Sequence, residues 1–100
     1  MSCGGRVYSD NIKLNQELNY LEELLIKNKG NKIRYRINGN EEFVNGVFES
    51  FKFDGNNVEI VIDGQVIKNQ KINEVSFSEY EERTDFWIYG EVTNRFNLYN

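Results

Sequence analysis

The chain has 100 residues, a mass of 11.8 kDa and a formal net charge of −4 at pH 7, and 39% of its residues are hydrophobic. A chain of this size forms one domain around one hydrophobic core, so we expect a single domain over residues 1–100. It has no histidine and one cysteine. These counts exclude Ser-His and Cys-His catalytic pairs, imidazole metal ligands, an intrachain disulfide and multi-cysteine zinc sites.

The N-terminal segment is expected to be flexible over residues 1–8. It contains Cys3, and no neighbouring side chain in the sequence could activate its thiol. Residues 1–9 lack the apolar region of a secretory signal, and no segment approaches the ~20 apolar residues of a transmembrane helix. We therefore expect a cytoplasmic protein with no membrane contact.

A helix is predicted over residues 10–29. Ser9 and Asp10 are suitable N-cap residues, and Gly30 is suitable as the residue that ends the helix. Spacings of three and four residues place a set of leucines on one helical face, and these are Leu14, Leu18, Leu21 and Leu25. We expect this face to pack on the rest of the domain.

From residue 32 onwards, apolar and polar residues alternate with the period of a β-strand. Glycine-containing turns divide the region into five predicted strands, of which the second is long and contains Gly46. A glycine inside a strand is typical of a bulge or bend. These signals predict a small antiparallel barrel over residues 32–77.

The C-terminal part is predicted as an acidic connection over residues 78–85 and a hairpin over residues 86–99, with its turn near Thr93 and Asn94. The predicted fold is therefore α+β and mainly β. It consists of an N-terminal helix, a barrel of about five antiparallel strands and a C-terminal hairpin.

The layout of residues 10–77 resembles the Sm-like fold, and more generally SH3-like barrels. The resemblance rests on the helix that leads into five strands and on Gly46, Asp54 and Asn57, which stand in the order of the Sm pattern. The spacing between these residues differs from that pattern, and Asp63-Gly64 stands where the family has an arginine before glycine. The resemblance therefore implies a fold, and no RNA-binding residue is transferred from it.

An acidic segment followed by aromatic residues is the first candidate binding site. Carboxylates beside aromatic side chains suit an interface or a mimic of nucleic-acid charge, and the alternative roles are a solubilising loop and completion of the core. The candidate partner-binding residues are Glu79, Glu81, Glu82, Asp85, Phe86, Trp87 and Tyr89.

A basic segment is the second candidate. Its members on the first predicted strand share one face at steps of about 6.6 Å, which could follow a phosphate backbone. The alternative is a solvated strand face that pairs with acids such as Glu42 or Glu59. The candidate nucleic-acid-binding residues are Lys27, Lys29, Lys32, Arg34 and Arg36.

The sequence favours a non-enzymatic, acidic protein-interaction module. Frequent residues with AT-rich codons indicate a low-GC genome, and with the small size they suggest a phage or mobile-element accessory protein. Its partner would be another protein, such as a basic nucleic-acid-binding defence protein that it inhibits. The alternative is an Sm-like RNA-binding module; a structural subunit of a homo-oligomer and an enzyme with dispersed carboxylates also stay open. No cofactor or metal site is predicted.

Overall fold

The computed structural model describes residues 7–100, so Cys3 and its neighbours lie outside the described residues. Helix α1 (Ile12–Lys27) precedes all the strands. Residues 7–100 contain seven strands, which are β1 (Lys32–Ile37), β2 (Val44–Asp54), β3 (Asn57–Ile62), β4 (Gln65–Asn69), β5 (Glu74–Glu79), β6 (Arg83–Tyr89) and β7 (Thr93–Tyr99). The prediction of a mainly β chain with one N-terminal helix is confirmed.

Helix α1 lies inside the predicted range, and its N-cap is Asn11 rather than Ser9 or Asp10. The Asn11 side chain accepts a hydrogen bond from the backbone N–H of Leu14 at 3.1 Å, which satisfies one of the free donors of the first turn. The predicted apolar face is confirmed, because the buried residues of the helix are Leu14, Leu18, Leu21 and Leu25.

The segment before the helix is ordered as far back as Tyr8, which differs from the flexible end expected over residues 1–8. Tyr8 is 9% exposed, and its ring centroid lies 4.7 Å from that of Phe53 in β2. Its backbone N–H donates to the side chain of Asn15 on α1. An aromatic ring that covers the core beside the helix gains enough contact to hold the backbone in place.

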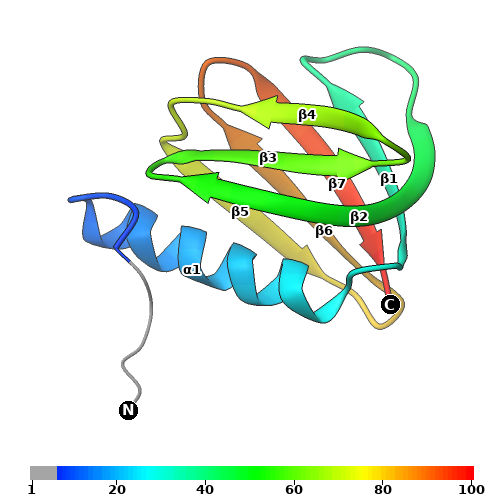
Figure 1. The fold of residues 1–100 in the computed structure, drawn as a ribbon, viewed down its shortest axis with the longest axis horizontal. Coiled ribbons are helices and arrows are strands. Elements are labelled where there is room, and N and C mark those ends of the chain that lie inside the picture. The colour runs from blue at the N-terminus through cyan, green and yellow to red at the C-terminus, as the bar shows by residue number, and fades with distance from the viewer. Residues whose placement is uncertain (1–6) are drawn as a thin grey trace.

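The strands form one antiparallel sheet in the order β4-β3-β2-β1-β7-β6-β5. Figure 1 shows that the sheet folds over, so that β2, β3 and β4 form a layer in front of β1, β7, β6 and β5. The ladder described over residues 7–100 ends at β4 and β5, so the structure shows a curled sheet rather than a closed barrel. The predicted terminal hairpin, β6 and β7, is part of this sheet.

Strand β2 joins the two layers. Its first residues pair with β1 and its later residues pair with β3, and the register shifts between Phe48 and Ser50. Gly46 lies just before this shift, where a Cβ atom would come within 2.7 Å of Ile62 Cγ2. The bend predicted from Gly46 is therefore present, because only a glycine allows β2 to approach the end of β3 so closely.

The substitution Gly46→Ala should lower the free energy of unfolding by about 1–3 kcal/mol. The added Cβ would also meet Asp63 Oδ2 at 2.8 Å, so the side chains of Ile62 and Asp63 have to move. Urea unfolding measures the loss, with Ser50→Ala at an exposed position of β2 as the matched control. Equal midpoints for the two variants would contradict this account of the bend.

The acidic connection predicted over residues 78–85 is wrong in its extent. Strand β5 continues to Glu79 and β6 begins at Arg83, and the turn between them is closed by the Tyr80 N–H donating to Arg83 O at 2.8 Å. The start of β6 is not marked by apolar residues. The inward-facing residue two positions before Phe86 is Thr84, which is buried although it is polar.

The turn of the last hairpin lies at residues 90–92, before the predicted position at Thr93 and Asn94. Asn94 is 1% exposed and belongs to β7. A Cβ on Gly90 would come within 2.4 Å of Gln70 O, so the turn packs directly against the connection from β4 to β5. Tertiary packing, rather than local turn preference, therefore sets the end of this hairpin.

The core lies between the two layers of the sheet and α1, which runs beside them (Figure 1). The buried leucines of α1 belong to this core. Phe86 and Phe96 lie on neighbouring strands, and their rings stack inside the core with their centroids 4.9 Å apart. Successive strand residues point to opposite faces, so their sequence neighbours in β6 and β7 lie on the outer face. Within residues 7–100, no helix is long and apolar enough to cross a membrane.

Candidate functional site

The outer face of β1, β7 and β6 brings together cationic side chains from distant parts of the sequence. In one row across the sheet, Arg34 lies opposite Asn97, and Asn97 lies opposite Asp85. In the next row, Arg36 lies opposite Arg95, which lies opposite Trp87. We call this surface the arginine face and define it as Lys32, Arg34, Arg36, Arg83, Asp85, Trp87, Arg95 and Asn97, together with the ring of Phe43.

Phe43 precedes β2 and forms the centre of the arginine face. The guanidinium carbons of Arg34, Arg36 and Arg95 lie 4.3, 4.9 and 5.4 Å from the centroid of its ring. The Arg95 guanidinium also lies 5.0 Å from the Trp87 ring. Attraction to the aromatic rings offsets part of the repulsion between these like charges and holds the side chains in one place.

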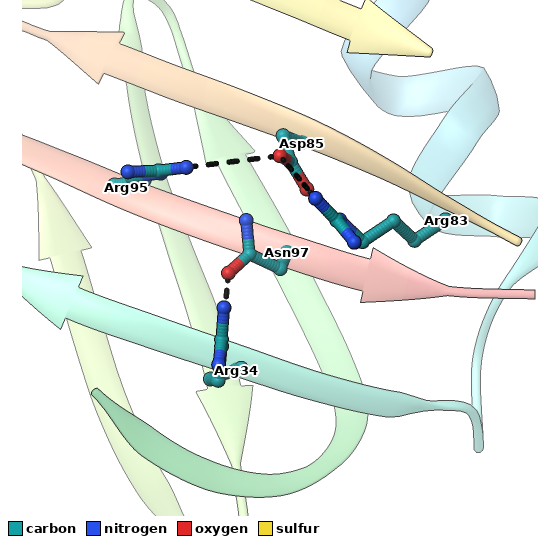
Figure 2. A network of polar contacts seen from close by, with 5 residues as sticks. All are labelled: Arg34, Arg83, Asp85, Arg95 and Asn97. Atoms are coloured by element: carbon teal, nitrogen blue, oxygen red, sulfur yellow. Dashed lines mark hydrogen bonds and ion pairs between the residues drawn. The ribbon is translucent and has the colours of Figure 1, made fainter. Parts of the chain in front are cut away.

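Asp85 is the carboxylate inside this group of cations, and its side chain is 2% exposed. Figure 2 shows Arg83 and Arg95 on its two sides; the Arg83 Nε donates to Asp85 Oδ1 at 2.8 Å, and Arg95 Nη2 lies 3.8 Å from Oδ2. The hydrogen bond and charge of Asp85 raise the pKa of the Arg83 guanidinium. A buried carboxylate is stable only with such partners, so Asp85 holds these two guanidinium groups in place.

Asn97 connects the network to β1. Its Oδ1 accepts a hydrogen bond from Arg34 Nε at 3.0 Å, and Figure 2 shows the amide between Arg34 and Asp85. Asn97 is fully buried, yet its Nδ2 has no hydrogen-bond partner among the described residues, and the same is true of Arg95 Nε. Five cationic side chains and one carboxylate give the arginine face more hydrogen-bond donors than acceptors, which is the composition of an anion-binding surface.

The acidic candidate site is divided by the fold. Glu79, Glu81 and Glu82 are exposed at the turn between β5 and β6. Asp85 is buried between two arginines and Phe86 is fully buried in the core, so neither side chain is presented to a partner. The reason is strand alternation: residue 86 points inward, and the outward residue 85 is covered by its arginine neighbours.

The remaining aromatic candidates, Trp87 and Tyr89, are partly exposed on the outer side of β6. Trp87 belongs to the arginine face through its contact with Arg95. Tyr89 is directly opposite Thr93 of β7, one row further along the sheet. Trp87 and Asp85 are therefore the members of the acidic set that belong to the arginine face.

The basic candidate site is divided as well. Lys32, Arg34 and Arg36 occupy alternate positions on β1, as predicted, and belong to the arginine face. Lys27 ends α1, and Lys29 lies with its Nζ 5.4 Å from the ring centroid of Phe51 in β2. The arginine face thus combines part of the basic set with Asp85 and Trp87 of the acidic set.

Sequence reasoning missed four side chains of this surface. The alternation of β7 was available as a signal, because the buried residues Phe96 and Leu98 leave Arg95 and Asn97 on the opposite face. The pairing of β7 with β1 was not available, because it joins the two ends of the chain. The missed residues are Phe43, Arg83, Arg95 and Asn97.

Elsewhere on residues 7–100 the structure contains two small polar depressions. One has a volume of about 130 Å³ and is lined from β2, β3 and residue 70; the other has a volume of about 200 Å³ beside the start of α1. Neither includes a member of the arginine face. No group of three or more cysteine, aspartate or glutamate side chains in the described part of the chain could hold a metal ion.

Comparisons of the chain with protein-family models, with curated proteins and with solved structures give no match.

Proposed function

We propose that the chain is a protein-interaction module that binds its partner through the arginine face. The observation that carries the proposal is the convergence of Arg34, Arg36 and Arg95 on the ring of Phe43, beside Trp87. Arginine and tryptophan are enriched in the residues that contribute most binding energy at protein interfaces. Three guanidinium groups on an outer sheet face supply that chemistry in one patch.

The arginine side chains are held in position before a partner arrives. Aromatic rings support Arg34, Arg36 and Arg95, and Asp85 fixes Arg83 and the far side of Arg95. Immobilising a long side chain on binding costs about 0.5–1.5 kcal/mol, so side chains that are already fixed bind with less loss of entropy. This preorganisation supports a role in recognition over that of a solvated strand face.

The charge of the face indicates the charge of the partner. The outer residues of β1, β7 and β6 include one carboxylate, that of Asp85, and the cations Lys32, Arg34, Arg36, Arg83 and Arg95. The surface is therefore positive, although the whole chain has a net charge of −4. A positive patch favours a partner with a negative surface, which is the opposite of the basic partner expected from the acidic segment.

Capture from a nuclease-treated lysate of the source cell or its host tests the proposal. The face variant combines Arg34→Glu with Arg36→Glu, and the control combines Lys52→Glu with Lys68→Glu on exposed positions of β2 and β4. Both variants change the net charge equally. We expect the wild type and the control to retain the same protein partner and the face variant to lose it. Equal capture of the partner by both variants would show that the arginine face does not bind it.

A second candidate function is RNA binding by the same surface, as in the Sm-like barrels that the sequence resembles. The observation in its favour is the position of Lys32, Arg34 and Arg36 on one face of β1. It predicts binding of mixed single-stranded RNA at low salt and a steep loss of affinity as salt rises. A partner that disappears from the capture after nuclease treatment would favour this function.

A further inference from the structure

We infer that the arginine face recognises an extended acidic segment of the partner protein, whose alternate carboxylates pair with Arg34 and Arg36. This inference rests on the proposed function and adds the chemistry of the partner. The hydrogen-bond donors that would contact the segment lie on the outer side of β1 and β7, where donors outnumber acceptors.

The arginines differ in how far their donors are already used. Arg83 has Asp85 as its partner, and Arg95 has a longer contact of 3.8 Å with the same carboxylate. Arg34 donates one hydrogen bond to an uncharged amide, that of Asn97. Within residues 7–100, the structure gives neither Arg34 nor Arg36 an ion pair with a carboxylate.

A carboxylate is the natural acceptor for such a group. The planar fork of a guanidinium donates two parallel N–H bonds to a carboxylate, and a guanidinium over an aromatic ring keeps these donors in its own plane. Asn97 Nδ2 and Arg95 Nε lie in the same network, but both atoms are buried. The groups that can reach a bound carboxylate are therefore the half-buried guanidinium groups of Arg34 and Arg36 over the Phe43 ring.

The spacing of the cations matches an extended peptide. Lys32, Arg34 and Arg36 are two residues apart on β1, which corresponds to about 6.6 Å between neighbours. An extended peptide places its own alternate side chains at the same interval. Three carboxylates at alternate positions of a partner segment would thus each face one cation of β1.

The surroundings of the face favour a short acidic segment over a long polyanion. Glu79, Glu81 and Glu82 are exposed at the β5–β6 turn, which precedes Arg83 of the arginine face, and Glu41 and Glu42 are exposed beside Phe43. A nucleic-acid strand that continued past the face would meet these carboxylates, and like charges placed together oppose binding. The ring of Phe43, a platform on which a base could stack, is already occupied by guanidinium groups.

Synthetic ligands test this inference directly on the full chain. The probe is a peptide of alternating glutamate and threonine with blocked ends, carrying three glutamates; the matched control replaces each glutamate by glutamine. A thymidine oligonucleotide with three phosphates provides the nucleic-acid arm at equal charge. Side-chain Nε–Hε signals of Arg34, Arg36 and Arg95 report binding in nuclear magnetic resonance titrations.

We expect the glutamate peptide to shift these signals and to bind about tenfold more tightly than the glutamine peptide, since a carboxylate forms charge-assisted, bidentate hydrogen bonds with a guanidinium group and a neutral amide does not. Arg36→Gln should lower the affinity for the glutamate peptide about tenfold, whereas Lys68→Gln on β4 should leave this affinity unchanged. Tighter binding of the oligonucleotide than of the peptide would overturn the inference in favour of nucleic acid.

The test separates this inference from the proposed function. If the glutamate peptide does not bind but capture of a protein partner still depends on Arg34 and Arg36, the acidic segment is wrong and the interaction module stands. If capture is insensitive to these two arginines, the proposed function itself fails.

Discussion

Replacing Phe86 by alanine should lower the free energy of unfolding by about 3–5 kcal/mol. The side chain is fully buried, and its ring lies 4.9 Å from that of Phe96 and 6.4 Å from that of Phe77. Removal of the ring would leave a cavity between β5, β6 and β7 that these packed strands cannot fill. Thermal or urea unfolding followed by circular dichroism measures the loss.

The neighbouring Trp87→Ala variant is the matched control, because it removes a larger ring from the outer face of the same strand. Trp87 is partly exposed and contacts the Arg95 side chain, so we expect a clearly smaller loss of stability. A surface role for Phe86 would instead leave the unfolding midpoint of Phe86→Ala close to that of the wild type, and this outcome would contradict the core assignment.

Asn94→Ala should cost about 1–3 kcal/mol of stability, because it leaves the buried Asn69 Oδ1 without the hydrogen-bond donor of Asn94. Asn94 Oδ1 accepts the backbone N–H of Asn38 at 3.1 Å, and Asn94 Nδ2 donates to Asn69 Oδ1 at 2.7 Å. These bonds join the end of β1, the start of β7 and the end of β4. The buried amide pair therefore connects the two layers of the sheet through a polar contact inside the core.

Asn45→Ala provides the comparison, since Asn45 is an exposed asparagine of β2. Its substitution should change stability by no more than about 0.5 kcal/mol. Chemical denaturation of the two variants under the same conditions distinguishes them. Equal stability of Asn94→Ala and Asn45→Ala would show that the amide pair contributes nothing to the packing of the two layers.

Local patterns in the sequence predict much of this fold. The leucine face of α1 follows from the helical period, and Asp63-Gly64 adopts positive φ at both residues, as a tight hairpin turn requires. These features depend on a few neighbouring residues. They are therefore readable without knowledge of the rest of the chain.

Features that depend on non-local pairing could not be read in the same way. Asparagine is a residue type that favours turns, but Asn94 has a buried hydrogen-bond partner, Asn69, in the other layer of the sheet. Asp85 follows an acidic segment that is typical of an exposed loop, but Arg83 and Arg95 cover its carboxylate. The sequence shows which residues alternate along a strand, whereas the partner of each strand is set by the packing of the whole domain.

The candidate site illustrates the same limit. The sequence predicts Lys32, Arg34 and Arg36 on one face of a strand, and it gives Trp87 as a candidate interface residue. Their assembly depends on the position of β7 between β1 and β6, which brings Arg95 into contact with both Phe43 and Trp87. Two binding hypotheses that were separate in the sequence therefore meet on one surface.

Site-specific photo-crosslinking tests the assignment of this surface most directly. A photoreactive side chain in place of Ser76 stands opposite Trp87 and leaves every arginine intact, while the same group in place of Glu59 on β3 samples the other layer. With nuclease-treated lysate, the account predicts a discrete protein crosslink from position 76 and none from position 59. A crosslink from position 59 alone, or a position-76 product made only of nucleic acid, would contradict it.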